Sequence, residues 1–445
     1  MNFPGKAAEV SPIENQIKAF LQTQGVAVSG VAGPERLDGP PSLDLDYTLP
    51  GGRSIISMVL PMNAAAIEDF LSKKSPAPHN LDQFRLYQQI QHAGYALAEF
   101  LKAKGFRARP VPPSADYRRH PYVFATLPSF SHRFGAIAAG TAGQAWSGNV
   151  MTREYGAAVV LGTVVTDAVL KSDPRPDPDH FIKTFCRRCR RCARVCPPGM
   201  FAADTPEYVL LNGKLHERAR RRNIDLCNIS CFGLHSLSQD RKWSNWGLHW
   251  IEEWIDNPPD PSRRLRLVAD MLKKGLSTGD STQRFFVLEK ITRHPWNQKL
   301  LAQTPALAAF PEDEAERYLV LAEFMAKTGI TGIESYPIPM VCGHCILVCG
   351  PTLEETKRRC KLLLGAGLVV PGPGGRMTRV DTFEEALALK RAYPLNVSRI
   401  RKLRDAAASL YLWHRHYFGF EPRSFIQGIR YQKKLKKTLL KNGPG

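Results

Sequence analysis

A run of four cysteines constrains this chain more than any other feature of its sequence. The stretch CRRCRRCARVCPP begins at Cys186, continues through Cys189 and Cys192, and ends with Cys196 and Pro197. Thiolates at the first three positions of such a run bind three irons of one [4Fe–4S] cluster. The fourth cysteine, next to a proline that turns the chain, binds a different cluster. One run therefore predicts a second set of cysteines elsewhere.

The second set lies in CGHCILVCGP, which carries Cys342, Cys345 and Cys349. The first two cysteines of this run are three residues apart and the last two are four residues apart, like the last three cysteines of the first run. The second run lacks only a counterpart of the first cysteine, Cys186. The stretch NIDLCNISC offers Cys227 and Cys231 as the missing ligand. Zinc is the alternative for paired CxxC elements, but a zinc site does not account for the third cysteine and the Cys-Pro step.

These spacings predict two [4Fe–4S] clusters, each of which takes ligands from both runs. The ligands expected for the first cluster are Cys186, Cys189, Cys192 and Cys349. Those expected for the second cluster are Cys196, Cys227, Cys342 and Cys345, with Cys231 as the alternative to Cys227. Cys360 is left over, and we expect it to be a small buried apolar residue.

The net charge of +20 over 445 residues is large. It indicates an anionic partner, such as nucleic acid, a membrane surface or an acidic redox protein, or else a solvated basic surface. Arginines between the cysteines would raise the cluster potential, dock an acidic electron donor or add plain surface charge; they are Arg187, Arg188, Arg190 and Arg191. The clearest basic segment, residues 430–442, is expected to be a helix that contacts a membrane surface or RNA, or that only aids solubility.

The segments before the cysteines predict an α/β domain. Residues 53–63 and 157–170 are apolar runs typical of buried strands. Residues 81–106 carry apolar side chains at helical spacing and end in Lys-Gly, which signals a helix C-cap. A strand, a long helix and a second strand indicate helices packed on a sheet. The short GAG sequence at 365–367 predicts a helix end and a turn.

Breaks in the pattern divide the chain into its expected parts. SDPRPDPD, at 172–179, is a linker, because it cannot continue a regular element. A chain of this length is expected to fold as two or three domains. We expect an N-terminal arm or loop at 1–50, an α/β domain at 51–180, a two-cluster domain at 181–355 with a helical insertion at about 232–340, and a basic helical extension at 356–445.

The sequence also bears on where the protein resides. No apolar run reaches the roughly 18 residues that predict a membrane span. The N-terminal residues lack the apolar core of a signal peptide and a pair of arginines. Cysteines in such a chain are expected to be metal ligands or free thiols rather than disulfides. These observations predict a cytoplasmic protein.

A longer pattern resembles a known family. The stretch AGTAGQAWSGNVMTREYG, at 139–156, is followed by LGTVVTDAVL, a short linker and the first cysteine run. This order resembles the cobalamin-dependent reductases, which comprise reductive dehalogenases and epoxyqueuosine reductases. The resemblance covers roughly residues 50–235 and 340–355. It implies a nitroreductase-like α/β domain that binds base-off cobalamin, followed by a ferredoxin-like domain with two [4Fe–4S] clusters. Electrons then pass through the clusters to the corrinoid, which cleaves a carbon–halogen or carbon–oxygen bond.

The resemblance also implies a corrinoid site at the glycine-rich stretch. Missing side chains let backbone amides approach a flat macrocycle. The candidate residues are Gly140, Gly143, Gly148, Tyr155, Gly156, Thr166 and Asp167. An ordinary turn followed by a core strand is the alternative. Ala142 and Ala145 stand where the family has glycines, which predicts a stiffer loop or a tighter pocket.

The proton donor is the least constrained part of the expected site. Epoxyqueuosine reductases carry an Asp shortly before the glycine-rich stretch, but residues 120–134 contain no Asp or Glu. Tyr122, Ser131 and His132 are the candidates, since a phenol or an imidazole can donate a proton. A lone histidine is more often structural than catalytic.

The sequence therefore predicts an oxidoreductase that acts on an organic small molecule and takes electrons from a low-potential ferredoxin, flavodoxin or reductase. The first alternative is an epoxyqueuosine reductase acting on tRNA, which the charge favours and the missing carboxylate disfavours. The second is a two-cluster electron-transfer protein without corrinoid. The third is a flavin-linked reductase, because a nitroreductase-like fold can hold FMN.

Overall fold

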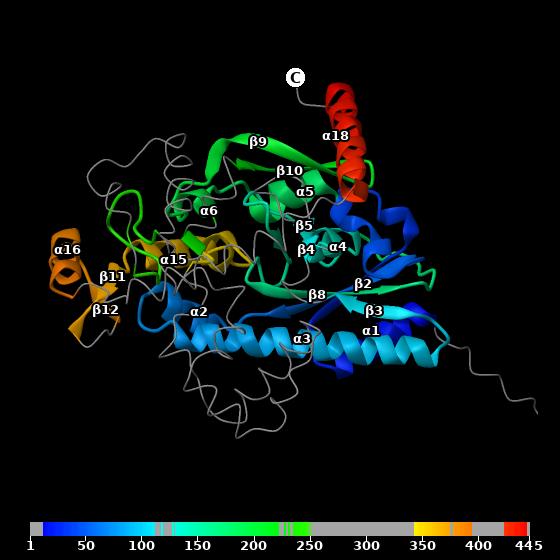
Figure 1. Ribbon diagram of the computed structural model, residues 1–445, viewed down its shortest axis with the longest axis horizontal. Helices are drawn as coiled ribbons and strands as arrows, with labels where there is room; N and C mark the ends of the chain where they lie inside the picture. Colours follow the sequence, from blue (N-terminus) through cyan, green and yellow to red (C-terminus); the bar gives the residue numbers. More distant parts are fainter. Residues whose placement is uncertain are drawn as a thin grey trace, which may run out of the picture.

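The computed structural model describes residues 12–111, 117–118, 127–128, 130–221, 227, 230–231, 235–248, 250, 342–373, 377–393 and 422–442 (Figure 1). Tyr122 and most of the insertion expected at 232–340 lie outside these residues. None of the described helices is both long and apolar enough to cross a membrane.

The N-terminal part is built on a four-stranded antiparallel sheet in the order β1-β2-β8-β3. The strands are β1 (Val28–Ala32), β2 (Ser54–Pro61), β3 (Ala108–Val111) and β8 (Val159–Thr166). Nearly every residue of β2 and β8 is buried, because both faces of the sheet are covered. This is why the two strands appear in the sequence as continuous apolar runs.

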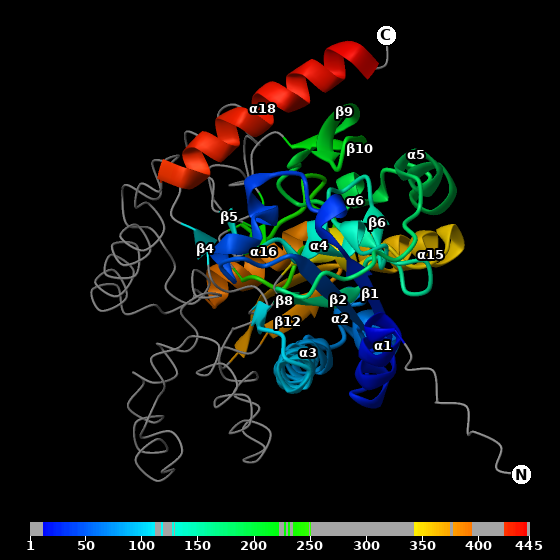
Figure 2. The ribbon, with the colours of Figure 1, turned by 90° about the vertical axis from the view of Figure 1, so that its right-hand side faces the viewer.

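Helices cover both faces of this sheet (Figures 1 and 2). On one side lie α1 (Ile13–Thr23), α2 (Ala64–Leu71) and α3 (Ala77–Ala103), and on the other lies α4 (His132–Ala138). Successive residues of a strand point to opposite faces. Ile56 of β2 therefore packs in the core with α3, while Ile55 packs in the core with α4. The predicted arrangement of helices on a sheet is confirmed.

Residues 13–32 differ from the arm or loop expected of this region. Helix α1 buries Ile17 and Leu21 completely, and β1 pairs along its whole length with β2. Both elements are short, and β1 has the sequence VSGVA, so neither produces a strong apolar pattern. Three turns of 3₁₀ helix follow: η1 (Pro34–Arg36), η2 (Pro41–Leu43) and η3 (Leu45–Tyr47).

The cysteine runs lie on short elements beyond the linker. The first run follows α5 (Pro178–Phe181) and occupies η4 (Ile182–Cys186) and α6 (Arg191–Arg194), and a hairpin of β9 (Phe201–Leu211) and β10 (Lys214–Arg221) comes next. The second run occupies α14 (His344–Leu347), and α15 (Leu353–Leu364) follows. The described residues 235–248 and 250 contain no helix, in contrast to the helical pattern predicted there.

The C-terminal part is not purely helical, as had been expected of residues 356–445. It contains a hairpin of β11 (Leu368–Pro371) and β12 (Met377–Val380), and two helices, α16 (Phe383–Ala392) and α18 (Pro422–Asn442). Gly365 caps α15 and Gly367 has a φ of 74°, so the predicted turn is present. Four short strands complete the structure: β4 (Tyr117–Arg118), β5 (Leu127–Pro128), β6 (Gly143–Gln144) and β7 (Val150–Met151).

Candidate metal centre

Two short helical turns bring the separate cysteine runs together. Helix α6 belongs to the first run and α14 to the second, and the two are in contact. Helix α15 also packs against α6. In Figure 1 these elements lie between the β9–β10 hairpin and α2. The fold thus places cysteines that are far apart in sequence around a common centre.

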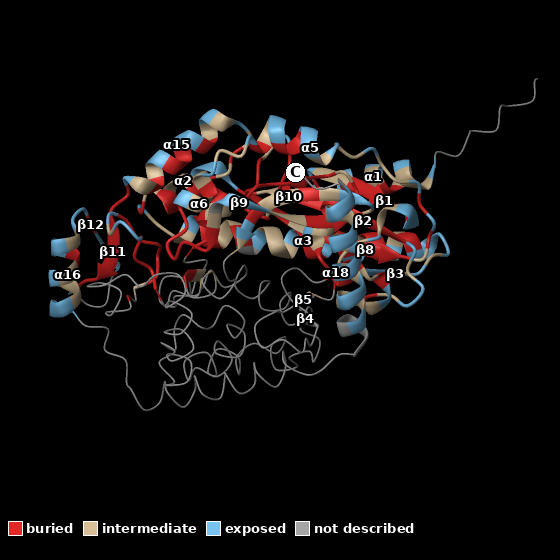
Figure 3. Cartoon of the chain, turned by 90° about the horizontal axis from the view of Figure 1, so that it is seen from above, coloured by how far each residue is buried: buried red, intermediate tan, exposed pale blue. Residues whose placement is uncertain are grey.

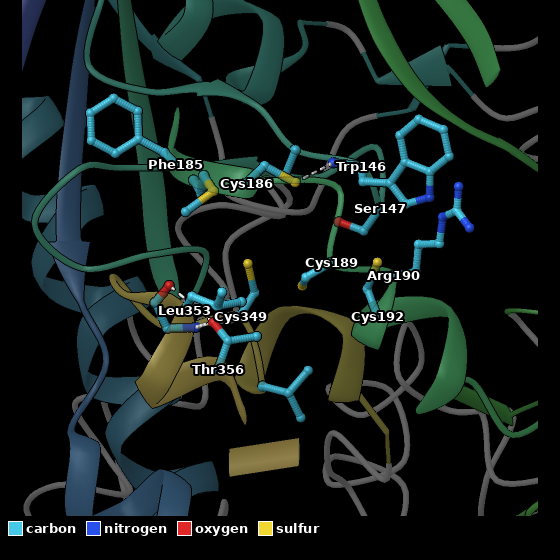
Figure 4. Close-up of a pocket in the computed structure, with 14 residues that line it drawn as sticks. Trp146, Ser147, Phe185, Cys186, Cys189, Arg190, Cys192, Cys349, Leu353 and Thr356 are labelled. Atoms are coloured by element: carbon cyan, nitrogen blue, oxygen red, sulfur yellow. Dashed lines mark hydrogen bonds between the residues drawn. The ribbon is translucent and has the colours of Figure 1, made fainter. Parts of the chain in front are cut away.

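The cysteines expected to bind the first cluster surround a single pocket. Cys186, Cys189 and Cys192 line it together with Cys349 of the second run. Figure 4 shows the four sulfur atoms facing the same space. Among the described residues, no three His, Cys, Asp or Glu side chains converge as the ligands of a single metal ion. The four thiols instead ring a space between them.

Backbone amides point toward this ring of sulfurs. The N–H of Trp146 donates a hydrogen bond of 3.2 Å to the Sγ of Cys186 (Figure 4), and the backbone of Arg188 also hydrogen-bonds the Cys186 thiolate. Arg187, Arg188 and Arg190 all have a positive φ, which non-glycine residues rarely adopt. Such backbone turns its N–H groups into a concavity that suits an anionic group. The loop therefore fits a thiolate-bound iron–sulfur cluster.

A second group of cysteines lies beside the first. Cys196, Cys342 and Cys345 interact electrostatically with Cys231. The Sγ of Cys231 also lies 3.5 Å from that of Cys227. Both candidates for the missing ligand thus lie within the group, and the choice that the sequence left open stays open.

The second group also receives hydrogen bonds at sulfur. The backbone N–H of Met200 donates to Cys196 Sγ at 3.3 Å, and Asn149 Nδ2 donates to Cys345 Sγ at 3.4 Å. Donors of this kind stabilise a thiolate and raise the reduction potential of a cluster bound to it. Nothing in the cysteine spacing pointed to Asn149, which comes from the α/β domain.

Burial dominates the electrostatics of these thiols. Loss of solvent raises the pKa of Cys196 to about 12 and that of Cys345 to about 11. The pKa values of Cys192 and Cys349 are also raised, first by burial and then by neighbouring thiolates. Buried thiols therefore keep their protons in the absence of metal, and cationic iron supplies the charge that lets them ionise.

The arginines between the cysteines serve mainly to fasten the loop. Arg188 forms an ion pair with Glu217, and Arg190 forms one with Asp204, so both bind the β9–β10 hairpin. Arg187 donates from Nε to the carbonyl of Thr184 at 3.0 Å. At least two of the four arginine charges are therefore already paired within the protein.

The expected corrinoid glycines are needed by the fold itself. A Cβ on Gly140 would overlap the carbonyl of Pro174, and one on Gly143 would overlap the ring of Phe181. A Cβ on Gly148 would meet the guanidinium of Arg221 at 2.5 Å. One on Gly156 would overlap the carbonyl of Cys349. The glycines thus let neighbouring segments of the chain pack closely against one another.

The other expected corrinoid residues are also used internally. Thr166 donates to the Arg107 carbonyl at 2.8 Å, and the Asp167 carboxylate accepts from the Arg107 backbone N–H and from its Nε at 2.8 and 2.7 Å. These bonds hold the end of β8 to the start of β3. The N–H of Tyr155 donates to Thr152 Oγ1 within a turn. Thr166, Asp167 and the Tyr155 backbone therefore have partners within the protein, and the assignment of the seven residues to a corrinoid site stays a prediction.

The described candidates for proton donor have structural partners. Ser131 caps α4 by accepting from the N–H of Phe134, and its own N–H donates to the carbonyl of Ser42. His132 Nδ1 lies 2.9 Å from Thr163 Oγ1 and so joins α4 to β8. Neither residue lines the cysteine pocket.

A buried polar cluster beside the second cysteine group was missed from the sequence. Lys73 is 4% exposed, and its Nζ lies 5.6 Å from the Phe70 ring and 5.4 Å from the Trp246 ring. Among the residues that the structure describes, Nζ has no hydrogen-bond partner. Burial lowers the pKa of Lys73 to about 7, against the attraction of Cys342. His344 is fully buried against Phe70 and Trp243. Its position between Cys342 and Cys345 was the only available signal.

No family model matches this chain, and no curated protein matches it. Solved structures with a similar fold include a reductive dehalogenase described in terms of B12-dependent dehalogenation, with 18% identity and a TM-score of 0.38 over 62% of this chain. A selenomethionine-labelled epoxyqueuosine reductase matches with 17% identity and a TM-score of 0.37, over 97% of this chain and 94% of its own. The epoxyqueuosine reductase from Streptococcus thermophilus matches with 14% identity and a TM-score of 0.34, over 72% of this chain and 100% of its own.

The match spans 38% of the length of the dehalogenase.

Proposed function

We propose that this chain is an iron–sulfur oxidoreductase of the cobalamin-dependent reductase superfamily, which carries two [4Fe–4S] clusters and uses them to reduce an organic substrate. The observation that carries the proposal is the meeting of the two cysteine runs. Four cysteines from both runs line one pocket, and five more gather beside it. The strained arginine loop and the amide donors at sulfur support a cluster at this place.

Each group of cysteines is assigned to one cluster. The first cluster would be held by Cys186, Cys189, Cys192 and Cys349. The second would be held by Cys196, Cys342, Cys345 and either Cys227 or Cys231. When bound, such clusters supply one-electron transfer. The protein contributes a buried site, fixed thiolates and hydrogen bonds from Trp146, Met200 and Asn149 that adjust the potential.

The two groups are close enough for their charges to interact. Cys345 acts electrostatically on Cys192 and Cys349 of the first group and on Cys196 and Cys227 of the second. Partly exposed cysteines occur in both groups, among them Cys189 in the first and Cys345 in the second. We propose that electrons from a low-potential ferredoxin, flavodoxin or reductase enter at one site and leave from the other.

The reaction proposed is reductive cleavage of a carbon–halogen or carbon–oxygen bond in a small organic molecule, in a cytoplasmic enzyme. The family resemblance supports a corrinoid as the group that receives the electrons. No described residue is assigned to the corrinoid, because other residues of the chain occupy the space beside each of the expected glycines. An epoxyqueuosine reductase acting on tRNA is the alternative enzyme, which the net charge of +20 favours.

A two-cluster electron-transfer protein without corrinoid is the second candidate function. The specific observation in its favour is the close packing around Gly140, Gly143 and Gly156. In this case the α/β domain would act as a scaffold, and the clusters would exchange electrons with a second protein. A flavin-linked reductase would show itself by the absorption spectrum of FMN.

Iron, sulfide and cobalt per chain test the proposal directly. The protein would be purified without oxygen after expression with cobalamin supplied. About eight irons and about one cobalt, as two cubanes and one corrin require, support the reductase. About eight irons without cobalt favour the electron-transfer protein. Fewer than about four irons would overturn both functions, because not even one cubane would then be filled.

A further inference from the structure

The C-terminal helix α18 is held on the body by one side only. Tyr431 accepts a hydrogen bond of 3.0 Å from the N–H of Leu210, and Gln427 donates one of 2.7 Å to Asp44. Lys434 forms an ion pair with Asp38. The three helix residues recur at steps of four and three, so they form a single stripe. The orientation of α18 about its axis is therefore fixed, and its opposite stripe faces away from the protein.

That outward stripe carries aliphatic as well as basic side chains. At ~100° per residue, Ile426, Ile429 and Leu440 lie roughly 140–180° around the helix from Tyr431. They are 48%, 42% and 80% exposed. In the part of the chain that the structure describes, seven large hydrophobic side chains are exposed, and three of the seven are on this stripe. Isolated exposed apolar residues are ordinary, but a concentration on one helix face indicates a binding surface.

Lys433 and Lys436 lie among these aliphatic side chains, and Arg430, Lys437 and Lys441 lie along one side of them. Six basic residues of α18 are exposed, namely Arg430, Lys433, Lys434, Lys436, Lys437 and Lys441, and of these Lys434 pairs with Asp38. The helix sequence contains no acidic residue. Figure 2 shows α18 running along the rim of the molecule, and Figure 3 shows most of its length as exposed. The outward face of α18 therefore presents aliphatic side chains between cationic ones, with no opposing charge on the same helix.

We propose that the outward face of α18 binds the surface of an anionic lipid membrane, with the helix lying parallel to that surface. A helix with a basic face and an apolar stripe places its aliphatic side chains at the boundary between headgroups and acyl chains. Its lysines and arginines then lie among the phosphates. RNA would neutralise the same cations, but it would leave Ile426, Ile429 and Leu440 in water. The inference does not depend on the proposed function.

The docked state of α18 strengthens this inference. A free amphipathic peptide must fold when it binds, and it loses conformational entropy in doing so. Here the helix is already ordered by Tyr431, Gln427 and Lys434, which all lie on the inward stripe. The lipid-facing residues are not needed for that attachment. They can therefore be replaced without removing the helix from the protein.

The test is flotation of the full, anaerobically purified protein with vesicles of phosphatidylcholine, with or without phosphatidylglycerol. We expect binding only to the anionic vesicles, weakened by salt. Replacing Lys433, Lys436 and Lys437 by Gln should lower vesicle affinity on the order of a hundredfold. Replacing Ile426, Ile429 and Leu440 by Ser should also lower it at least tenfold, at unchanged charge.

A matched control removes the same charge elsewhere. Lys102, Lys171 and Lys361 are exposed and lie outside α18, and replacing all three by Gln should leave vesicle binding unchanged. Equal loss in the control and in the α18 lysine variant would overturn the proposal, because net charge alone would then account for binding. Full binding by the serine variant would also overturn it. The proposal would also be overturned if the protein bound tRNA through the α18 lysines and did not bind vesicles.

Discussion

At the scale of single residues, Cys349 best tests how the clusters take their ligands. It lies in the second run, but its side chain lines the pocket of the first. We expect Cys349→Ala to lose the cluster of the 186–192 run and to keep the other, because only the first cluster loses a ligand. Iron should fall from about eight to about four per chain. Electron paramagnetic resonance of the reduced protein should show one remaining cluster.

Cys360 provides the matched control for this substitution. It is a buried cysteine on α15 that is not among the residues lining the pocket. Cys360→Ala should keep both clusters and cost about 1 kcal/mol of stability from lost packing. If Cys349→Ala removed only the cluster of the second group, the assignment of Cys349 to the first cluster would be wrong.

Lys73 is expected to raise the reduction potential of the second cluster. Reduction adds a negative charge, and a buried cation beside Cys342 favours that change. We expect Lys73→Met to lower the midpoint potential of one cluster by roughly 60 mV, a tenfold change in a one-electron equilibrium. The measurement is a redox titration followed by electron paramagnetic resonance at pH 6, below the Lys73 pKa of about 7.

The neighbouring lysine separates this effect from a general loss of charge. The Lys74 side chain is 73% exposed and pairs with Asp69 at 3.0 Å, so solvent screens it. Lys74→Met should leave both potentials unchanged. Equal shifts in the two variants, or an unchanged potential in Lys73→Met with both clusters present, would count against a role for Lys73.

Spacing in the sequence was enough to predict that cysteines of the two runs come together, because the run itself has the spacing of cluster ligands. The groups that act on the sulfurs could not be found in this way. Trp146 and Asn149 belong to the α/β domain, and Lys73 follows α2. Each reaches the cysteines only through tertiary packing. Of the groups that act on the sulfurs, His344 is the one whose place in the sequence, between Cys342 and Cys345, gave a signal.

At the scale of elements, the glycine-rich stretch is a packing joint between the α/β domain and the second cysteine run. Gly156 has a φ of 68°, and a Cβ there would overlap the carbonyl of Cys349. We expect Gly156→Ala to cost roughly 2–4 kcal/mol, from backbone strain and overpacking. The displaced Cys349 should also reduce occupancy of the first cluster. Anaerobic denaturant titration and iron analysis measure the two effects.

Gly105 isolates the contribution of the backbone alone. Its φ is 87°, but nothing lies within 4 Å of the Cβ position. Gly105→Ala should therefore cost only about 1 kcal/mol and leave the iron content unchanged. If the two alanine variants behaved alike, contact between Gly156 and the second cysteine run would have no part in the effect.

The glycines also show a limit of pattern reasoning at the level of elements. Their spacing resembles a cofactor loop, but a sequence does not say which atoms fill the space left by a missing side chain. Here Pro174, Phe181, Arg221 and Cys349 fill it. The strands β2 and β8 and the helix α3 were predictable, because they are long and strongly apolar or periodic. The shorter α1 and β1 were not.

At the scale of the whole molecule, the cysteine centre shares apolar cores with the α/β domain. The N–H of Trp146 reaches Cys186, and the N–H of Ala157 donates to the carbonyl of Cys349 at 2.8 Å. The α/β domain thus contacts both cysteine runs. Leu347 of α14 and Val195, next to α6, belong to the apolar core that the sheet and α3 also form, but α6 and α14 are each only four residues long. Such short helices are not stable without a partner.

Removal of iron should therefore affect the molecule unevenly. A metal site that is absent from the unfolded chain contributes its binding free energy to folding. We expect a chelator under reducing conditions to expose the amides of α6 and α14 while those of β2, β8 and α3 stay protected. Hydrogen exchange read by mass spectrometry measures each segment. Unchanged protection of α6 and α14 would mean that packing alone holds them, and equal loss in β2 and β8 would mean that the clusters support the whole fold.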